Sequence, residues 1–458
     1  MQKSFFVFLL LFGISVSAFA QRISYPQLVQ RTERPTFFID DLSLPGENGK
    51  TNLVFTFRFN NNFIPFRKLP VQHTFNAPED AGFYSTLRLN TEIFEGKLKR
   101  RGEPAVNSVS RDVWADTVYT STFEETQSAD QYASGVLSVN LDPGNYHYIF
   151  QLSMLQEKNE RSTQRRNIKI ENLREKETGE VYLLKKVENR DIELNLQLMN
   201  MADNVPFGDD FTTLIRIPEY EEGAEYQLKI NRAREVRDDT TTGAEIYTYS
   251  LKPAEIHAQS TVKLASSEEP SLSLTKGNHP YTYALVSVPG STLENAFYQM
   301  TLHKNGSEDA LATGYFRSYW PDMPASLYNL NIAIEHLKFI ASEKQIEQID
   351  KGNRKEKEEK FRAFWGQRDP TPNTVYNELM AEYYRRIDYA FKEFGSQENP
   401  MGHESDQGEV YIKFGPPNSK ERVFPPGGTT REVWKYPNRS FVFEATTGFG
   451  DFKLVGTK

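Results

Sequence analysis

Eight polar residues in the last third of the chain have the types and spacing that could support chemistry. They are Arg368, Asp369, Glu378, Glu382, Arg386, His403, Ser405 and Asp406. In a hydrolase, His403 would be the general base for Ser405. Asp406 or Glu378 would then orient the imidazole. In a metal site, Glu378 and Glu382 would project from one face of a helix. His403 and Asp406 would complete a set of nitrogen and oxygen ligands.

A structural interpretation of the same residues requires no reaction. Asp406 suits a turn or a helix cap ahead of Gly408, and Glu382 with Arg386 suits an i,i+4 ion pair. A catalytic triad is recognised by geometry, which spacing alone does not provide. The other six histidines are scattered, and none has the spacing of a zinc motif such as H-E-x-x-H. The structural interpretation is therefore favoured, and no metal site or cofactor is predicted.

Helices and then strands must position these residues. After Pro321 the apolar period changes from two to about 3.6, and Ser342 with Gln345 forms a capping-box pattern. The charged run 351–360 suggests a solvated helix face, and the prolines of 369–372 end that helix. A long helix is predicted over about 373–394. Strands are predicted over 409–414, 431–436 and 440–444, with Gly415-Pro416-Pro417 ending the first. Residues 322–458 are thus expected to form an α+β domain.

This C-terminal part resembles the GWxTD domain of bacterial exported proteins over about 327–455. The matching residues are Trp365, Arg368, Asp369, Pro370, Asn377, Glu378, Tyr384, Arg386, Gly402, Asp406, Gly408, Gly415, Pro416 and Pro417. The chain departs from the signature at two positions, because His403 stands where the family has Trp and Ser405 where it has Thr. The resemblance implies an exported or periplasmic protein with β-rich domains ahead of the named domain. It implies no established activity and no cofactor.

Two all-β segments are predicted ahead of that domain. Residues 21–175 and 176–321 contain short alternating strands separated by turn residues, and we interpret each as an immunoglobulin-like sandwich. In the first segment, the run from Asp142 to Tyr146 has the pattern of a tyrosine corner, in which a Tyr hydroxyl bonds the preceding loop. In the second, residues 234–243 have the composition of a surface loop.

The N-terminus has the three parts of a secretory signal peptide. Lys3 supplies charge, an apolar run spans 5–12, and an Ala-x-Ala site ends at Ala20, so cleavage is expected before Gln21. Residues 1–20 would then be removed. The chain has no Cys, so no lipidation, disulfide or thiolate site is expected. No later run has the roughly 20 apolar residues of a membrane helix.

The composition limits the partners. The formal net charge of −8 would become −9 after Lys3 is removed, and such dispersed acidity argues against nucleic acid. The sequence favours an exported, non-enzymatic cell-envelope protein, periplasmic or extracellular, that binds an envelope protein or a cell-surface polymer through its C-terminal domain. The alternative is a periplasmic hydrolase or metal-dependent enzyme that uses Glu378, His403, Ser405 and Asp406.

Overall fold

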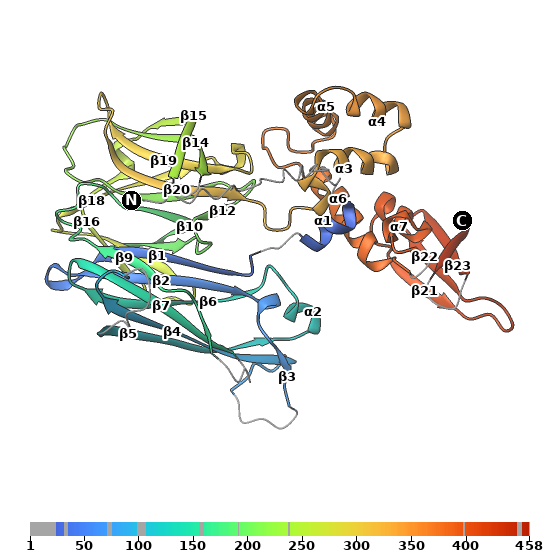
Figure 1. Ribbon diagram of the computed structural model, residues 1–458, viewed down its shortest axis with the longest axis horizontal. Coiled ribbons are helices and arrows are strands. Elements are labelled where there is room, and N and C mark those ends of the chain that lie inside the picture. Colours follow the sequence, from blue (N-terminus) through green and yellow to red (C-terminus); the bar gives the residue numbers. More distant parts are fainter. Residues whose placement is uncertain are drawn as a thin grey trace, which may run out of the picture. The chain divides into compact units, whose positions relative to one another are not determined.

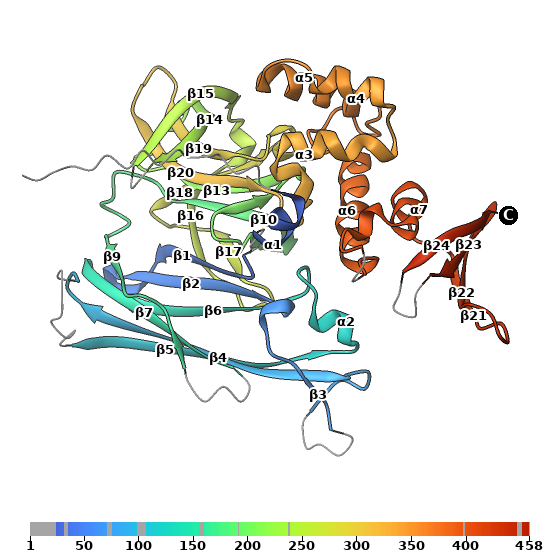
Figure 2. The same cartoon turned by 45° about the vertical axis from the view of Figure 1, so that its right-hand side comes forward.

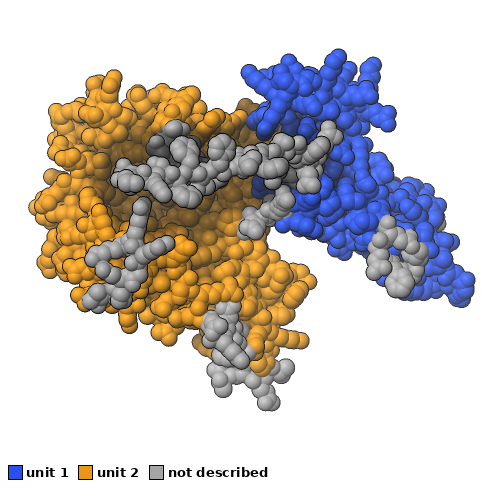
Figure 3. Space-filling view, viewed as in Figure 1, with its two compact units in different colours: residues 1–33, 323–369, 378–458 blue, residues 34–322, 370–377 orange. Residues whose placement is uncertain are grey.

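The chain divides into two compact units in the computed structural model. The described residues are 24–31, 35–70, 76–98, 107–154, 160–190, 192–236, 239–396, 399–446 and 451–457. Unit 1 contains residues 1–33, 323–369 and 378–458, and unit 2 contains 34–322 and 370–377 (Figure 3). The predicted signal peptide lies outside the described residues. The predicted order of all-β segments followed by an α+β segment is confirmed.

The first β segment of unit 2 is a sandwich of two antiparallel sheets (Figures 1 and 2). One sheet has the order β1-β2-β6, from β1 (Phe37–Pro45), β2 (Thr51–Asn60) and β6 (Tyr132–Leu141). The other is made of β3 (Arg67–Lys68), β4 (Phe83–Glu95), β5 (Ser108–Thr120), β7 (Gly144–Met154), β8 (Arg161–Ser162) and β9 (Arg166–Ile170). Alternating apolar side chains such as Phe55, Phe57 and Leu89 fill the core between the sheets. Short helix α2 (Phe123–Thr126) precedes β6.

The tyrosine corner predicted in this segment is confirmed. The Tyr146 hydroxyl donates a hydrogen bond to the Asp142 carbonyl oxygen at 3.0 Å. The bond joins the start of β7 to the loop that precedes it, as in immunoglobulin-like sandwiches.

The second β segment contains a closed ring of six strands and a separate sheet of five. The ring has the order β10-β11-β17-β16-β18-β13, formed by β10 (Val181–Arg190), β11 (Glu193–Leu198), β13 (Phe211–Arg216), β16 (Ile256–Leu264), β17 (Ser271–Lys276) and β18 (Tyr281–Val288). The sheet has the order β12-β20-β19-β14-β15, formed by β12 (Asn204–Pro206), β14 (Tyr226–Val236), β15 (Asp239–Ser250), β19 (Phe297–Lys304) and β20 (Ala310–Tyr319). Side chains from all six ring strands form one buried cluster, which Leu44 and Val54 of the first segment join. Closure removes the exposed edges that an open sheet would leave.

The surface loop predicted over 234–243 is wrong. Residues 234–236 belong to β14 and residues 239–243 to β15, and Arg234 pairs with Thr241. Consecutive β-branched threonines favour an extended strand, and this preference outweighs the polarity that suggested a loop.

Unit 2 also includes residues 370–377 from the far end of the chain. The Val375 amide donates to the Ser291 carbonyl oxygen at 2.9 Å, and the Tyr376 ring lies 5.2 Å from Trp320. The helix predicted from about 373 therefore begins later, at Glu378. The motif residues Asp369, Pro370, Asn377 and Glu378 lie where the chain passes between the units.

Unit 1 is mainly helical. Its helices are α1 (Tyr25–Arg31), α3 (Leu330–Glu335), α4 (Glu343–Asp350), α5 (Arg354–Gly366), α6 (Glu378–Glu393) and α7 (Asp406–Phe414), with 3₁₀ helices η5 (Ala325–Tyr328), η6 (His336–Phe339) and η7 (Gly402–Glu404). Ser342 and Gln345 meet in the predicted capping box, since the Gln345 side chain accepts from the Ser342 amide. Tyr25 and Leu28 of α1 are buried in the same core as Tyr384 and Ile387. The β segment predicted to start at residue 21 thus starts only after α1.

A small antiparallel sheet completes unit 1, with the order β21-β22-β23-β24. Its strands are β21 (Ser419–Val423), β22 (Arg431–Tyr436), β23 (Arg439–Ala445) and β24 (Phe452–Thr457). The strand predicted over 409–414 is wrong, because this segment is helix α7. The run Val410-Tyr411-Ile412 has strand-like residue types, but the N-cap at Ser405 and the packing of Val410 and Ile412 into separate cores stabilise a helix. Gly415 is the C-cap of α7, so Gly415-Pro416-Pro417 ends a helix and not a strand.

Candidate functional site in the signature region

The signature segment connects the end of α6 to the start of α7. Ser405 is the N-cap of α7: its hydroxyl accepts from the Gly408 amide at 3.0 Å and donates to the Gly402 carbonyl oxygen at 2.7 Å. Both hydrogen-bonding roles of this hydroxyl are therefore used locally. A nucleophile would instead direct its proton to a base.

Two signature glycines allow this segment to pack closely. A Cβ atom on Gly402 would lie 2.4 Å from the Ala390 carbonyl oxygen, and one on Gly408 would lie 2.1 Å from the Gly402 carbonyl oxygen. Both distances are below any normal contact, and the atoms met belong to the backbone. Only glycine fits at these two positions without moving α6, η7 or α7.

Asp406 joins the first turn of α7 to the sheet. Its Oδ2 accepts a hydrogen bond of 2.7 Å from the Leu454 amide in β24. The carboxylate also lies at a helix N-terminus, where negative charge is favourable. Asp406 therefore links helix α7 to strand β24, and the cap that the sequence suggested at Asp406 is supplied by Ser405 instead.

His403 lies in an aromatic cluster and is only 1% exposed. Its ring centroid lies 5.1 Å from those of Tyr25 and His336, 5.7 Å from Phe391 and 6.4 Å from Phe339. The residue that replaces the family's Trp thus occupies an aromatic core position. Its Nδ1 is buried and has no hydrogen-bond partner among the described residues.

Burial keeps both histidines of this cluster neutral. Loss of water lowers the pKa of His403 to about 4. Loss of water, with a smaller contribution from His403, lowers the pKa of His336 to about 3. The His336 Nδ1 lies 2.9 Å from the buried Ser326 hydroxyl. A base with such a pKa accepts protons poorly near neutral pH, so this pair is badly suited to general base catalysis there.

A second buried network holds α1 in unit 1. The Tyr25 hydroxyl donates to Asp388 Oδ1 at 2.6 Å, and Asp388 Oδ2 accepts from the Ala325 amide at 2.9 Å. Burial, and then the negative charge of Asp388, raise the pKa of Tyr25. The first described residues of the chain are therefore tied to α6 and η5.

Sequence reasoning missed Tyr25, Ser326, His336 and Asp388. His336 follows directly on the apolar stripe of α3, and Asp388 interrupts the apolar stripe of α6. A polar residue inside an apolar stripe is a signal that could have found both. Tyr25 offered no such signal, because 363 residues separate it from Asp388.

A cavity of about 610 Å³ adjoins this cluster within unit 1. Its lining includes Tyr25, His336 and His403, with Asn331, Lys357 and Glu404. Glu404 pairs with Lys338 at 2.6 Å, which lowers the pKa of its carboxyl group. The cavity mixes polar and apolar groups, but its two histidines are too buried to reach far into it.

The acidic residues of α6 take part in helix-surface contacts. Glu382 Oε1 accepts from Arg386 Nε at 2.7 Å, which confirms the predicted i,i+4 pair. Glu378 is exposed at the start of the helix. Across the residues that the structure describes, no group of three or more Asp, Glu, Cys or His side chains is arranged to hold a metal ion. The four proposed ligands are thus not brought together.

Several other motif residues are buried or make hydrogen bonds within the protein. Trp365 is buried against Tyr383 and Tyr384, at ring distances of 5.4 and 5.8 Å, and the Tyr384 hydroxyl donates to the Ala333 carbonyl oxygen at 2.6 Å. Arg368 donates to the Phe364 carbonyl oxygen at 2.7 Å. Asn377 is buried. Tyr436 donates to the Gly415 carbonyl oxygen at 2.8 Å, beside Pro416 and Pro417.

The family comparison agrees with this C-terminal architecture. The model of the GWxTD domain matches residues 296–452, so this part of the chain contains a GWxTD domain. The match begins at the start of β19, earlier than the resemblance from about residue 327 suggested.

Two further comparisons were made. No curated protein matches the chain. Among solved structures, a type II cohesin dyad from the adaptor ScaA scaffoldin of Acetivibrio cellulolyticus is similar at 12% identity, over 58% of this chain and 88% of that one, with a TM-score of 0.14. No helix in the described parts of the chain is long and apolar enough to cross a membrane.

Proposed function

We propose that this chain is an exported, non-enzymatic interaction protein of the cell envelope, released as a soluble chain after signal cleavage. Its β segments carry the GWxTD domain, which binds an envelope protein or a cell-surface polymer. The observation that supports this proposal is that the signature residues are occupied by packing and hydrogen bonds inside unit 1. The Ser405 hydroxyl caps α7, the Asp406 carboxylate bonds to β24, and His403 is a neutral core residue.

The hydrolase alternative has less support from the same geometry. It needs His403 to take a proton from Ser405, but that hydroxyl donates to the Gly402 carbonyl oxygen. It also needs an imidazole that is basic near neutral pH, whereas burial lowers the pKa of His403 to about 4.

The small sheet of unit 1 offers a surface for a protein partner. Phe424, which follows β21, is 71% exposed, and Val455 of β24 is 55% exposed. Val423 and Leu454 are exposed beside them along the chain. Exposed apolar patches can mark protein-binding sites, and these side chains on or next to the two edge strands of the sheet are the candidates for such a site.

Affinity capture from the native envelope tests this assignment. We expect Phe424→Ser to lose the partners that the unmodified chain retains. Phe123→Ser is the matched control, since Phe123 is 60% exposed on α2 of unit 2. Equal partner sets for both variants, or none for the unmodified chain, would count against the C-terminal domain as the binding part.

Export is tested separately by fractionation. We expect a variant with Ala18 and Ala20 replaced by Arg to keep its N-terminal extension and to stay with the membrane fraction, because the signal peptidase needs small residues there and the uncleaved apolar run stays in the membrane. The unmodified chain should begin at Gln21 in N-terminal sequencing of the envelope fraction. An unmodified chain found uncleaved in the cytoplasm would contradict export.

A further inference from the structure

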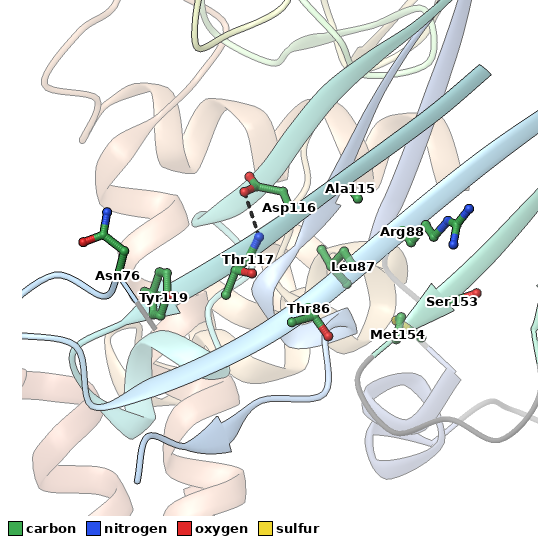
Figure 4. A pocket seen from close by; sticks show the side chains of 10 residues that line it. All are labelled: Asn76, Thr86, Leu87, Arg88, Ala115, Asp116, Thr117, Tyr119, Ser153 and Met154. Atoms are coloured by element: carbon green, nitrogen blue, oxygen red, sulfur yellow. Dashed lines mark hydrogen bonds between the residues drawn. The ribbon is translucent and has the colours of Figure 1, made fainter. Parts of the chain in front are cut away.

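A surface hollow of about 750 Å³ crosses strands β4, β5 and β7 in the first β segment. Figure 4 shows its lining: Asn76, Thr86, Leu87, Arg88, Ala115, Asp116, Thr117, Tyr119, Ser153 and Met154. We call it the sheet groove. It is separate from the signature region, which belongs to unit 1.

Strand alternation determines which side chains the sheet groove presents. Leu87 and Leu89 of β4 point into the sandwich core, so Thr86 and Arg88 lie on the opposite, outward face. The register places Thr117 opposite Thr86, while Ala115 and Ser153 flank Arg88. The middle of the groove therefore has small side chains and hydroxyl groups.

The backbone of the central strand is already paired. β4 bonds to β5 along one side and to β7 along the other. An extended peptide adds to a sheet through the free backbone groups of an edge strand, and β4 has no free edge at the groove. A ligand that lies over β4 must therefore be recognised through side chains.

The two ends of the sheet groove differ in chemistry. At one end the Tyr119 ring lies near Asn76, as Figure 4 shows. At the other end, the exposed Arg88 side chain is held by its neighbour Asn90, since Arg88 Nε donates to Asn90 Oδ1 at 3.2 Å. The groove thus has an aromatic ring at one end and the hydrogen-bond donors of Arg88 at the other.

Charge in the groove is sparse. Arg88 is the one charged side chain that the register places on the outward face of the groove. Asp116, opposite Leu87 in the register, is exposed and also lines the groove, and its Oδ1 accepts from the Thr117 amide at 2.7 Å (Figure 4). An anionic polymer needs several cations in a row, so neither nucleic acid nor a highly acidic glycan fits.

We propose that the sheet groove binds an uncharged glycan chain. This inference goes beyond the proposed function, because it adds to the binding surface of unit 1 a separate glycan-binding surface on unit 2. Hydroxyl groups of a neutral sugar can both donate to and accept from Thr86, Thr117 and Asn76, and Arg88 can donate to ring or hydroxyl oxygens. The apolar C–H face of a pyranose ring fits against the Tyr119 ring, whose π face is negative.

A glycan array with neutral and acidic members, probed with the full mature chain, tests this inference. We expect binding to at least one neutral oligosaccharide, and at least tenfold weaker binding by Tyr119→Ala and by Arg88→Ala. Tyr315→Ala is the matched control, because Tyr315 is 39% exposed on β20 and lies outside the groove. Circular dichroism and thermal unfolding confirm that each variant folds. Thr117→Arg, which fills the groove without removing a core contact, provides a second blocking variant.

Three outcomes would overturn the inference. These are no binding to any neutral glycan, binding to acidic glycans only, and neutral-glycan binding that Tyr119→Ala, Arg88→Ala and Thr117→Arg all leave unchanged. None of them bears on the capture experiment with Phe424→Ser. Failure of the sheet groove is thus distinguishable from failure of the proposed function.

Discussion

The signature region of unit 1 and the sheet groove of unit 2 use polar residues in opposite ways. In the signature region, Ser405 and Asp406 bond to backbone groups of their own unit and His403 is buried. In the sheet groove, Thr86, Arg88 and Thr117 line an open hollow. The strongest sequence motif therefore lies where elements of unit 1 pack against one another. The sheet groove carries no motif, yet its side chains are available to a ligand. A sequence motif can reflect the packing of a fold as well as a chemical function.

The largest effect that would sharpen this contrast is expected at Gly408. Gly408→Ala places a Cβ atom 2.1 Å from the Gly402 carbonyl oxygen, and the backbone must shift to accept it. We expect the free energy of unfolding to fall by about 3 kcal/mol, the upper end for overpacking. Hydrogen exchange measured over α6 and α7 in the full chain reports this loss. Gly366→Ala is the control, since a Cβ atom there meets nothing within 4 Å.

A second effect is the loss of stability in acid. The pKa of His403 is about 4 in the folded chain against 6.5 for an unperturbed group, so the unfolded state binds the proton first as the pH falls. Stability is complete above pH 6.5 and decreases down to about pH 4, by about 3 kcal/mol for this residue. Protonation of His336 lowers stability in the same way, and this loss continues down to about pH 3.

His403→Phe separates this contribution from the general effects of acid. Urea unfolding of the full chain at pH 7.5 and pH 4.5 should show a smaller difference for the variant than for the unmodified chain. An equal loss of stability at pH 4.5 in both proteins would show that a group other than His403 takes up the destabilising proton.

A smaller effect on stability is expected for the hydrogen bond that joins α1 to α6. Tyr25→Phe removes the donor to Asp388 Oδ1 and leaves a half-buried carboxylate with one fewer hydrogen bond. We expect a loss of about 2 kcal/mol, the usual range for a bond to a charged group. Faster exchange or proteolysis of α1 would report it. Tyr389→Phe, on an exposed tyrosine of α6, should change stability by less than about 0.5 kcal/mol.

The smallest effect is expected in the sheet groove itself. Thr86→Ala removes an outward hydroxyl and one methyl group from β4, and we expect stability to change by about 0.5 kcal/mol or less. Thermal unfolding of the full chain measures it. A loss of several kcal/mol would mean that the outward face of β4 is as structural as the signature region, and the contrast between the two would disappear.

The sequence predicted those elements in which the local pattern and the tertiary environment agree. In β2 the alternating Leu53, Phe55, Phe57 and Phe59 are all buried in one core, and α6 carries a wide apolar stripe. Helix α7 was mistaken for a strand because Val410, Tyr411 and Ile412 favour strands locally, and the helix depends on a cap and on two cores that spacing does not reveal.

Long-range contacts account for the rest. Closure of the ring requires β10 to pair with β13 and β16 with β18, which no local period encodes. Of the site, the ion pair Glu382–Arg386 was predicted correctly, whereas the helix cap expected at Asp406 is Ser405, and Asp406 is the first residue of α7. The aromatic surroundings of His403 were not, because Tyr25 reaches it from the other end of the sequence.

The most direct test of the central claim is affinity capture from the envelope with His403→Phe at pH 7.5. The account holds that the signature is architectural, so it predicts a folded variant that keeps the partners of the unmodified chain. A variant with unchanged circular dichroism and unfolding that has lost those partners would contradict it.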